Sequence, residues 1–162
     1  MTEVQAVPQT SADPDVTSGV AQFLGPVVVD LTALSVDGKQ AHWHVRGANF
    51  QAVHELLDTV VDHARDYADT AAERVVALGL PIDARIQTVG SKTTTPTMTA
   101  GFQQADAVIA QVIASIDATL ITVRTAVDEL ATLDAVSQDV VIEIARGLEK
   151  DRWFLFAHLA TK

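Results

Sequence analysis

The chain has 162 residues, 48% of them hydrophobic, which suits one domain with a buried core and excludes a disordered chain. It contains no cysteine, which excludes disulfides, thiolate nucleophiles and cysteine-based zinc sites. Twenty-one acidic residues against 11 basic ones give a formal net charge of −10, and so acidic a protein attracts cations and repels nucleic acid and anionic lipid.

The apolar segments of the chain predict a core and not a membrane span. No charged segment followed by an apolar run marks a signal peptide, and no window of about 18 uninterrupted apolar residues occurs. We therefore expect a cytoplasmic protein that does not cross a membrane.

Residues 1–16 carry two prolines and many small polar side chains, and we expect them to form a flexible tail. A helical period begins near Thr17, so the folded domain is predicted to cover residues 17–162. Pro26 lies inside this first helical pattern and would cost about 3 kcal/mol in a helix interior, so the helix either kinks there or begins there.

The rest of the chain predicts three more long helices and no strand. The second covers about 50–78, with Asn49 as a candidate N-cap and with Gly79 and Pro81 as stop signals. Residues 80–99 form a long connection with room for a short helix near 83–88. The third helix covers about 100–131, with Phe102 at the start of its apolar stripe, and the fourth covers about 135–160.

This order of elements predicts an all-α fold, a four-helix bundle. The long connection between the second and third helices can cross the bundle, as it does in ferritin-like folds.

Side chains that bind metals occupy one arc of the second helix, beside its apolar stripe. They are His54, Asp58, Asp69 and Glu73, which form two pairs at i, i+4 spacing. For any one of these acids alone, an ordinary solvated position is an equally good explanation, so the argument depends on the pattern.

The two pairs are too far apart to bind one ion within a single chain. Asp58 and Asp69 are 11 residues apart (69 − 58), which is about 16 Å along a helix, whereas metal–ligand bonds are only about 2–2.5 Å long. If two copies of this helix pack antiparallel about a two-fold axis, each pair faces the other pair of its partner. His42, near the end of the first helix, can add a second imidazole.

The sequence around these positions closely resembles the Dps family of small ferritins. Spacings of 12, 4, 11 and 4 residues separate His42, His54, Asp58, Asp69 and Glu73, as in the ferroxidase ligands of that family. The resemblance covers roughly residues 20–160, and its segments are Lys-Gln-Ala over 39–41, His-Trp-His-Val-Arg-Gly-Ala-Asn-Phe over 42–50, Ala-Val-His-Glu over 52–55, Leu-Asp over 57–58, Ala-Glu-Arg over 72–74, Ser-Lys-Thr over 91–93 and Trp-Phe over 153–154.

The resemblance implies a homo-dodecameric shell with tetrahedral symmetry that oxidises Fe(II), often with hydrogen peroxide, and stores a ferric mineral inside. It implies that His42, His54 and Asp58 come from one subunit and Asp69 and Glu73 from its two-fold partner, with Glu73 bridging two ions. Imidazole and carboxylate ligands suit iron, with zinc as a competing ion. The Glu-x-x-His pairs of ordinary ferritins are absent from the sequence, which argues against a di-iron centre inside one bundle.

Other notable residues have a structural interpretation beside a functional one. For Trp43 and Trp153 we favour core packing over the quenching of radicals, and we expect His63 and His158 on the surface. His44 stands where the family often has Asn, and its role is open. Asp134, Asp139 and Glu143 open the fourth helix, where acids favour the helix dipole. In Dps shells, acids in this region line three-fold pores for iron, so Asp134 and Asp139 are candidate pore residues.

Two other classes of function compete with an iron-storing ferroxidase. One is a protein that compacts DNA in the nucleoid, for which oxidation of iron is secondary. The other is a metal-dependent hydrolase whose bound metal activates water, although no substrate pocket can be inferred from these helices.

We predict that the tail does not bind DNA at neutral pH. No Lys or Arg precedes Lys39, whereas Glu3, Asp13 and Asp15 are acidic, so the tail cannot release counterions from phosphates. A gel-shift assay at about 0.15 M salt without divalent ions should show no retarded DNA band. A retarded band that disappears on deletion of residues 1–16 would show the charge argument to be wrong.

Overall fold

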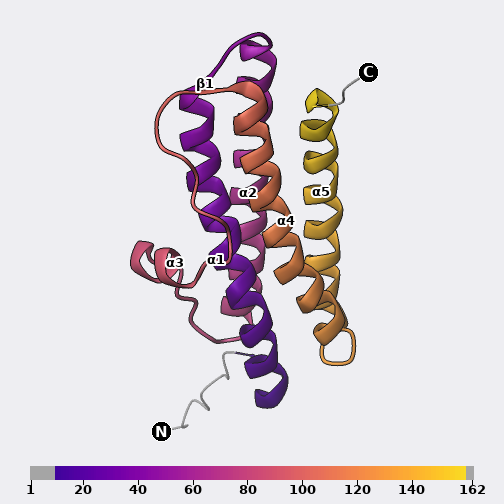
Figure 1. Ribbon diagram of the computed structural model, residues 1–162. Coiled ribbons are helices and arrows are strands. Elements are labelled where there is room, and N and C mark those ends of the chain that lie inside the picture. The colour runs from indigo at the N-terminus through magenta and orange to yellow at the C-terminus, as the bar shows by residue number, and fades with distance from the viewer. Residues whose placement is uncertain (1–9, 160–162) are drawn as a thin grey trace, which may run out of the picture.

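The computed structural model describes residues 10–159, and this part of the chain is an all-α, ferritin-like four-helix bundle (Figure 1). The predicted fold class is therefore confirmed. In chain order, the elements are α1 (Pro14–His44), β1 (Val45–Arg46), α2 (Phe50–Ala77), α3 (Ile86–Lys92), β2 (Gln103–Gln104), α4 (Ala105–Leu130) and α5 (Ala135–Leu159).

The connection from α2 to α4 returns along the length of the bundle, as Figure 1 shows, so that α2 and α4 run in the same direction. It carries the predicted short helix, although α3 begins at Ile86 and lies a few residues later than expected. α1 packs most extensively against α2, and α4 packs most extensively against α5.

α1 begins earlier than predicted and passes through its proline without a break. Asp13 caps it by accepting a hydrogen bond from the Asp15 backbone N–H at 2.8 Å, so the last residues of the predicted tail are helical. Residues 1–9 of that tail lie outside the described residues. Pro26 cannot donate to the carbonyl of Gln22, but both residues are exposed, so water can satisfy that carbonyl.

The prediction that the chain has no strand is wrong at one end of the bundle. β1 and β2 pair in parallel, with Val45 opposite Gln103 and Arg46 opposite Gln104. Two residues per strand are too few to give a period of two in the sequence. Phe102 is not in the third helix either: it is 61% exposed, and the Arg46 guanidinium lies 3.2 Å from the centre of its ring.

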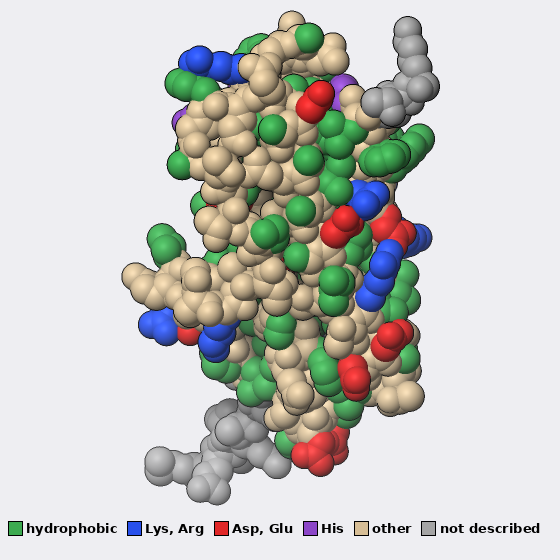
Figure 2. Space-filling view, in the orientation of Figure 1, with side chains coloured by type: hydrophobic (Ala, Val, Ile, Leu, Met, Phe, Trp, Pro, Cys, Tyr) green, Lys and Arg blue, Asp and Glu red, His purple; other side chains and the backbone are tan. Residues whose placement is uncertain are grey.

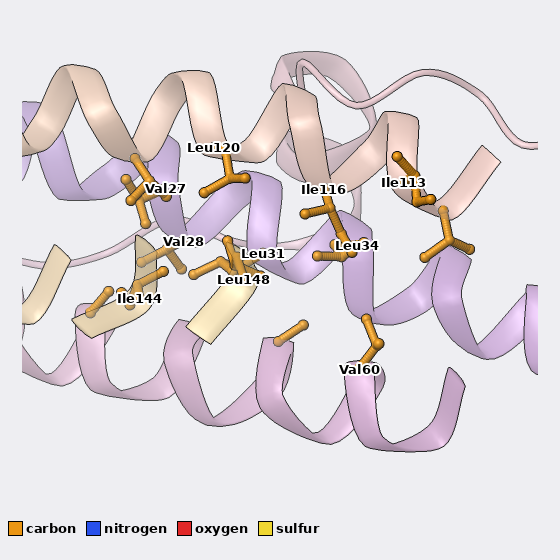
Figure 3. Close-up of a cluster of buried hydrophobic side chains, with 14 of the residues drawn as sticks. Val27, Val28, Leu31, Leu34, Val60, Ile113, Ile116, Leu120, Ile144 and Leu148 are labelled. Atoms are coloured by element: carbon orange, nitrogen blue, oxygen red, sulfur yellow. The ribbon is translucent and has the colours of Figure 1, made fainter. Parts of the chain in front are cut away.

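The core lies along the centre of the bundle and is built from the predicted apolar stripes (Figure 3). Its members from the four long helices include Val27, Leu31, Leu34, Val60, Ile116, Leu120, Ile144 and Leu148. By length and hydropathy, two described helices, α1 and α4, could span a membrane, but 56% and 50% of their apolar windows are buried inside the bundle. That burial is typical of core helices in a helical bundle.

One buried carboxylate ties the long connection to the bundle. Asp30 of α1 is 1% exposed. Its Oδ1 accepts from the Thr93 hydroxyl and the Thr94 backbone N–H at 2.9 and 2.7 Å. Its Oδ2 accepts from the hydroxyls of Thr94 and Thr122, both at 2.7 Å. A single side chain of α1 therefore holds both the connection and α4.

We predict that Asp30→Ala lowers the free energy of unfolding by about 3 kcal/mol, because it removes the buried acceptor that four hydrogen bonds share. Denaturation with urea or guanidinium measures this loss. Asp128→Ala, which removes an exposed carboxylate of α4, is the matched control and should change stability by less than about 0.5 kcal/mol. Equal losses in the two variants would contradict the role of Asp30.

Candidate metal centre

Two histidines at the junction of α1 and α2 hold each other in place. The rings of His42 and His54 stack with their centroids 3.6 Å apart and an angle of 21° between their planes. The Nδ1 of His42 donates to the backbone carbonyl of His54 at 2.8 Å, and the Nδ1 of His54 donates to the carbonyl of His42 at 2.9 Å.

These reciprocal bonds define the chemistry of both rings. A carbonyl only accepts, so each Nδ1 must carry the proton, and each Nε2 is then left with a lone pair that can bind a metal ion. A hydrogen bond from the other ring nitrogen is the usual support of a metal-binding histidine. His42 is buried at 6% exposure, so its orientation is also fixed by packing.

Asp58 lies one helical turn after His54, and its side chain is 43% exposed. Its Oδ1 is 3.3 Å from the Nδ1 of His42 and also contacts the Nζ of Lys39 on α1. The hydrogen bond with Lys39 holds the pKa of Asp58 below its ordinary value, against the smaller opposing effect of burial. Asp58 is therefore ionised at neutral pH and can bind a cation.

Lys39 was not among the predicted site residues. The signal that points to it is its position three residues before His42, which places both side chains on the same face of α1. Sequence alone does not show that this face turns toward α2 at the level of Asp58.

Asp69 and Glu73 are exposed side chains of α2, more than two turns further along the helix. Within residues 10–159, no three His, Asp or Glu side chains of one chain are grouped so as to hold a metal ion. His42, His54 and Asp58 lie near one another at one end of α2 without forming such a group, and Asp69 and Glu73 lie apart from them. The five-residue ligand set stays a prediction that needs a second subunit.

One expectation about other residues is wrong and one is incomplete. Trp43 and Trp153 are 61% and 63% exposed, so neither packs in the subunit's own core. The side chain of His63 is 38% exposed, but its Nδ1 also hydrogen-bonds both carboxylate oxygens of Asp151, at 2.9 and 3.0 Å. Asp151 is 1% exposed, and burial raises its pKa while the hydrogen bond with His63 opposes that rise. The pair joins α2 to α5.

Asp134 is the N-cap of α5, as the structural interpretation expected. Its Oδ2 accepts from the Ser137 backbone N–H at 2.9 Å and from Arg74 Nη2 at 2.7 Å. Burial would raise the pKa of Asp134, but the hydrogen bonds from Ser137 and Arg74 outweigh it and lower the pKa. Asp139 is exposed one turn further along α5. The role of these two acids in a pore stays a prediction.

Comparisons with known proteins agree on one group. A family model described as a ferritin-like domain matches residues 24–162. The "DNA protection during starvation protein" of Mycolicibacterium smegmatis is 33% identical over 88% of this chain and 78% of its own length. The protein of the same name from Agrobacterium fabrum is 34% identical over 90% of both chains. A solved structure of Dps from Microbacterium arborescens, described as the high iron form, is 59% identical with a TM-score of 0.90, covering 93% of this chain and 98% of that one.

We predict that Asp134 and Asp139 assist the entry of iron by attracting cations to a pore. The variant Asp134→Asn/Asp139→Asn removes both charges while Asn keeps the N-cap of α5, so the fold and assembly should be preserved. Iron uptake, followed by absorbance at low salt and low iron, should become severalfold slower. If uptake is unchanged, capping is the whole role of Asp134.

Proposed function

Because the chain belongs to the Dps family of ferritin-like proteins, we propose that it oxidises Fe(II) at centres shared between two subunits and stores the ferric product inside an assembled shell. Iron storage and DNA protection are the activities of this family as a whole, and its members are in general ferroxidases. The finer statements about ligands, oxidant and assembly are our proposal.

The observation that carries the proposal is the reciprocal bonding of His42 and His54. Each ring is fixed by the other's carbonyl, and each keeps Nε2 for a metal ion. Asp58 adds an ionised oxygen ligand beside them. Such an arrangement supports metal binding better than core packing, since packing alone requires no free nitrogen and no adjacent carboxylate.

We propose that the remaining ligands, Asp69 and Glu73, come from the two-fold partner. The rise of α2 keeps Asp69 about 16 Å from Asp58 in the same chain, and Glu73, four residues later, about 22 Å from it. An antiparallel partner helix brings its own pair opposite His54 and Asp58, and the symmetry produces two equal centres. Glu73 has the length to bridge two ions.

Iron is the substrate of this proposed reaction. Carboxylates favour the higher charge of Fe(III), and imidazoles hold Fe(II), so a mixed ligand set binds both oxidation states. One hydrogen peroxide molecule takes one electron from each of two Fe(II) ions. With two protons from solvent, it is reduced to two molecules of water, and both ions become Fe(III). Zn(II) accepts the same ligands without redox chemistry and is therefore a competing ion.

Assembly into a twelve-subunit shell with tetrahedral symmetry is part of the proposal. The described part of the subunit exposes several large apolar side chains, and such surface often marks a contact between proteins. Figure 2 shows hydrophobic side chains at the surface near the C-terminal end of α5, where Trp153, Phe154 and Phe156 are 63%, 38% and 53% exposed. Contacts between subunits would cover such side chains.

The names of the relatives describe them as proteins that protect DNA. Under this proposal, the present chain could protect DNA without binding it. Fe(II) and peroxide together generate hydroxyl radicals, and their joint consumption at the centre removes both reagents. This route is compatible with the acidic N-terminal tail and the net charge of −10.

We predict that two inactive variants restore activity when they are assembled together. The variant His54→Ala/Asp58→Ala keeps Asp69 and Glu73, whereas Glu73→Ala keeps His54 and Asp58. Random pairing from unfolded subunits gives an intact centre at about a quarter of the positions, and the rate of iron oxidation should recover to roughly that fraction.

The matched control mixes His54→Ala with Asp58→Ala, two defects on the same side of the centre, and should recover nothing. Mixing of subunits is verified by tagging one variant. No recovery in the first mixture, with mixed dimers proven, would refute the shared centre.

A further inference from the structure

Two oppositely charged side chains lie midway between the two predicted ligand pairs of α2. Asp62 follows Asp58 by four residues, and Arg65 precedes Asp69 by four residues. At about 100° per residue, both lie on the same arc of α2 as the predicted ligands. Their side chains are 71% and 56% exposed, and the Nη1 of Arg65 is 3.8 Å from the Oδ1 of Asp62.

The position of these two residues has a consequence when two subunits pair. In an antiparallel pair of helices about a two-fold axis, each step forward on one helix is a step back on the other. If Asp58 lies opposite the partner's Asp69, then Asp62, four residues further on, lies opposite the partner's Arg65, four residues further back. The symmetry repeats the contact, so that Arg65 lies opposite the partner's Asp62.

We propose that Asp62 and Arg65 form an ion-pair network with the same two residues of a second copy of the chain, and that this network fixes the register in which the two subunits complete their metal centres. The inference rests on the proposed function, which sets the register of the two helices. Each guanidinium has five donors and each carboxylate has two oxygens, so each group can bind its neighbour in the same helix and its counterpart across the axis.

The charges on the arc explain why such a network is needed. Each arc carries the three predicted acidic ligands and Asp62, in a chain of net charge −10, so two arcs that face each other repel. The other arginine of α2, Arg74, is bound to Asp134 of α5. Arg65 is therefore the cation that α2 presents on this arc, and it lies at the axis, between the two centres where iron would neutralise the other acids.

The alternative is an ordinary ion pair within one helix. Exposed pairs at i, i+3 spacing contribute little to stability. The contact of 3.8 Å is also longer than a charge-assisted hydrogen bond, which measures about 2.7–2.9 Å. Within one subunit, neither charge is fully engaged, and both remain open to a partner.

Reversal of the charges separates these two explanations. Asp62→Arg places two arginines of each subunit at the axis, and Arg65→Asp places two acids there, so like charges meet in both variants. The double variant Asp62→Arg/Arg65→Asp restores opposite charges. Asp128→Arg, at an exposed acid of α4, is the matched control for the change of charge. Circular dichroism verifies that every variant keeps its helices.

Two measurements follow the pairing: the visible absorption of Co(II) bound by the assembled protein, and gel filtration at low and high salt. Every variant keeps all five predicted ligands. At low salt, each single reversal should bind Co(II) at least about tenfold more weakly and should assemble less, because juxtaposed like charges oppose association. High salt should reduce both losses. The double variant and Asp128→Arg should resemble the unchanged protein.

Assembly of the two single variants together is the decisive experiment. In a mixed pair, each of the two positions meets the opposite charge across the axis, although like charges remain side by side within each chain. Random pairing makes half of the pairs mixed, so at least about half of the Co(II) binding and of the assembly should return. An ion pair that acts only within one helix would not be repaired by a second chain.

The inference is overturned if the single reversals bind Co(II) and assemble like the unchanged protein, or if their mixture recovers neither property. Failure of the proposed function has a different signature, because the unchanged protein would then not oxidise Fe(II). In that case, recovery of assembly in the mixture would still support the ion-pair network, and its absence would overturn the network as well.

Discussion

Two hydrogen bonds between the ends of α1 and α2 determine how the candidate centre is built. Each of His42 and His54 donates from Nδ1 to the other's backbone carbonyl, so the rings and the helix ends position one another. With this junction fixed, Asp58 follows one turn along α2, and Lys39 comes within reach from one turn earlier on α1. A change that breaks either bond would therefore disturb the candidate ligands and the helix packing together.

The apolar core determines where a metal can bind. The bundle interior is filled by Leu, Ile and Val from the four long helices, and burying several carboxylates there would require compensating charges. The predicted ligands on α2 consequently lie on an arc outside the core, where a straight helix spreads them along its axis. The rise of about 1.5 Å per residue then separates the two pairs, so assembly, and not folding alone, would complete the centre.

Other carboxylates that are buried or partly buried show how this acidic protein uses charge. Asp30 receives four hydrogen bonds and no cation, whereas Asp151 is paired with His63 and Asp134 with Arg74. Asp58 differs from these three, because its side chain is 43% exposed while it contacts the ammonium of Lys39.

The sequence by itself determined the helices and the ligand-bearing arc of α2, because both follow from local periodicity: a stripe at 3.6 residues marks the buried face, and residues at i, i+4 share an arc whatever the helix packs against. It also showed that Asp58 and Asp69 cannot bind one ion within one chain, because the axial distance between two residues of a helix depends only on how many residues separate them. The tertiary structure alone decided that Pro26 lies within a continuous helix, that β1 pairs with β2, that His63 reaches Asp151, and that Lys39 faces Asp58. The three contacts join residues that are far apart in the chain or on different helices. They depend on how each helix is rotated about its axis, and the packing of the whole core sets that rotation.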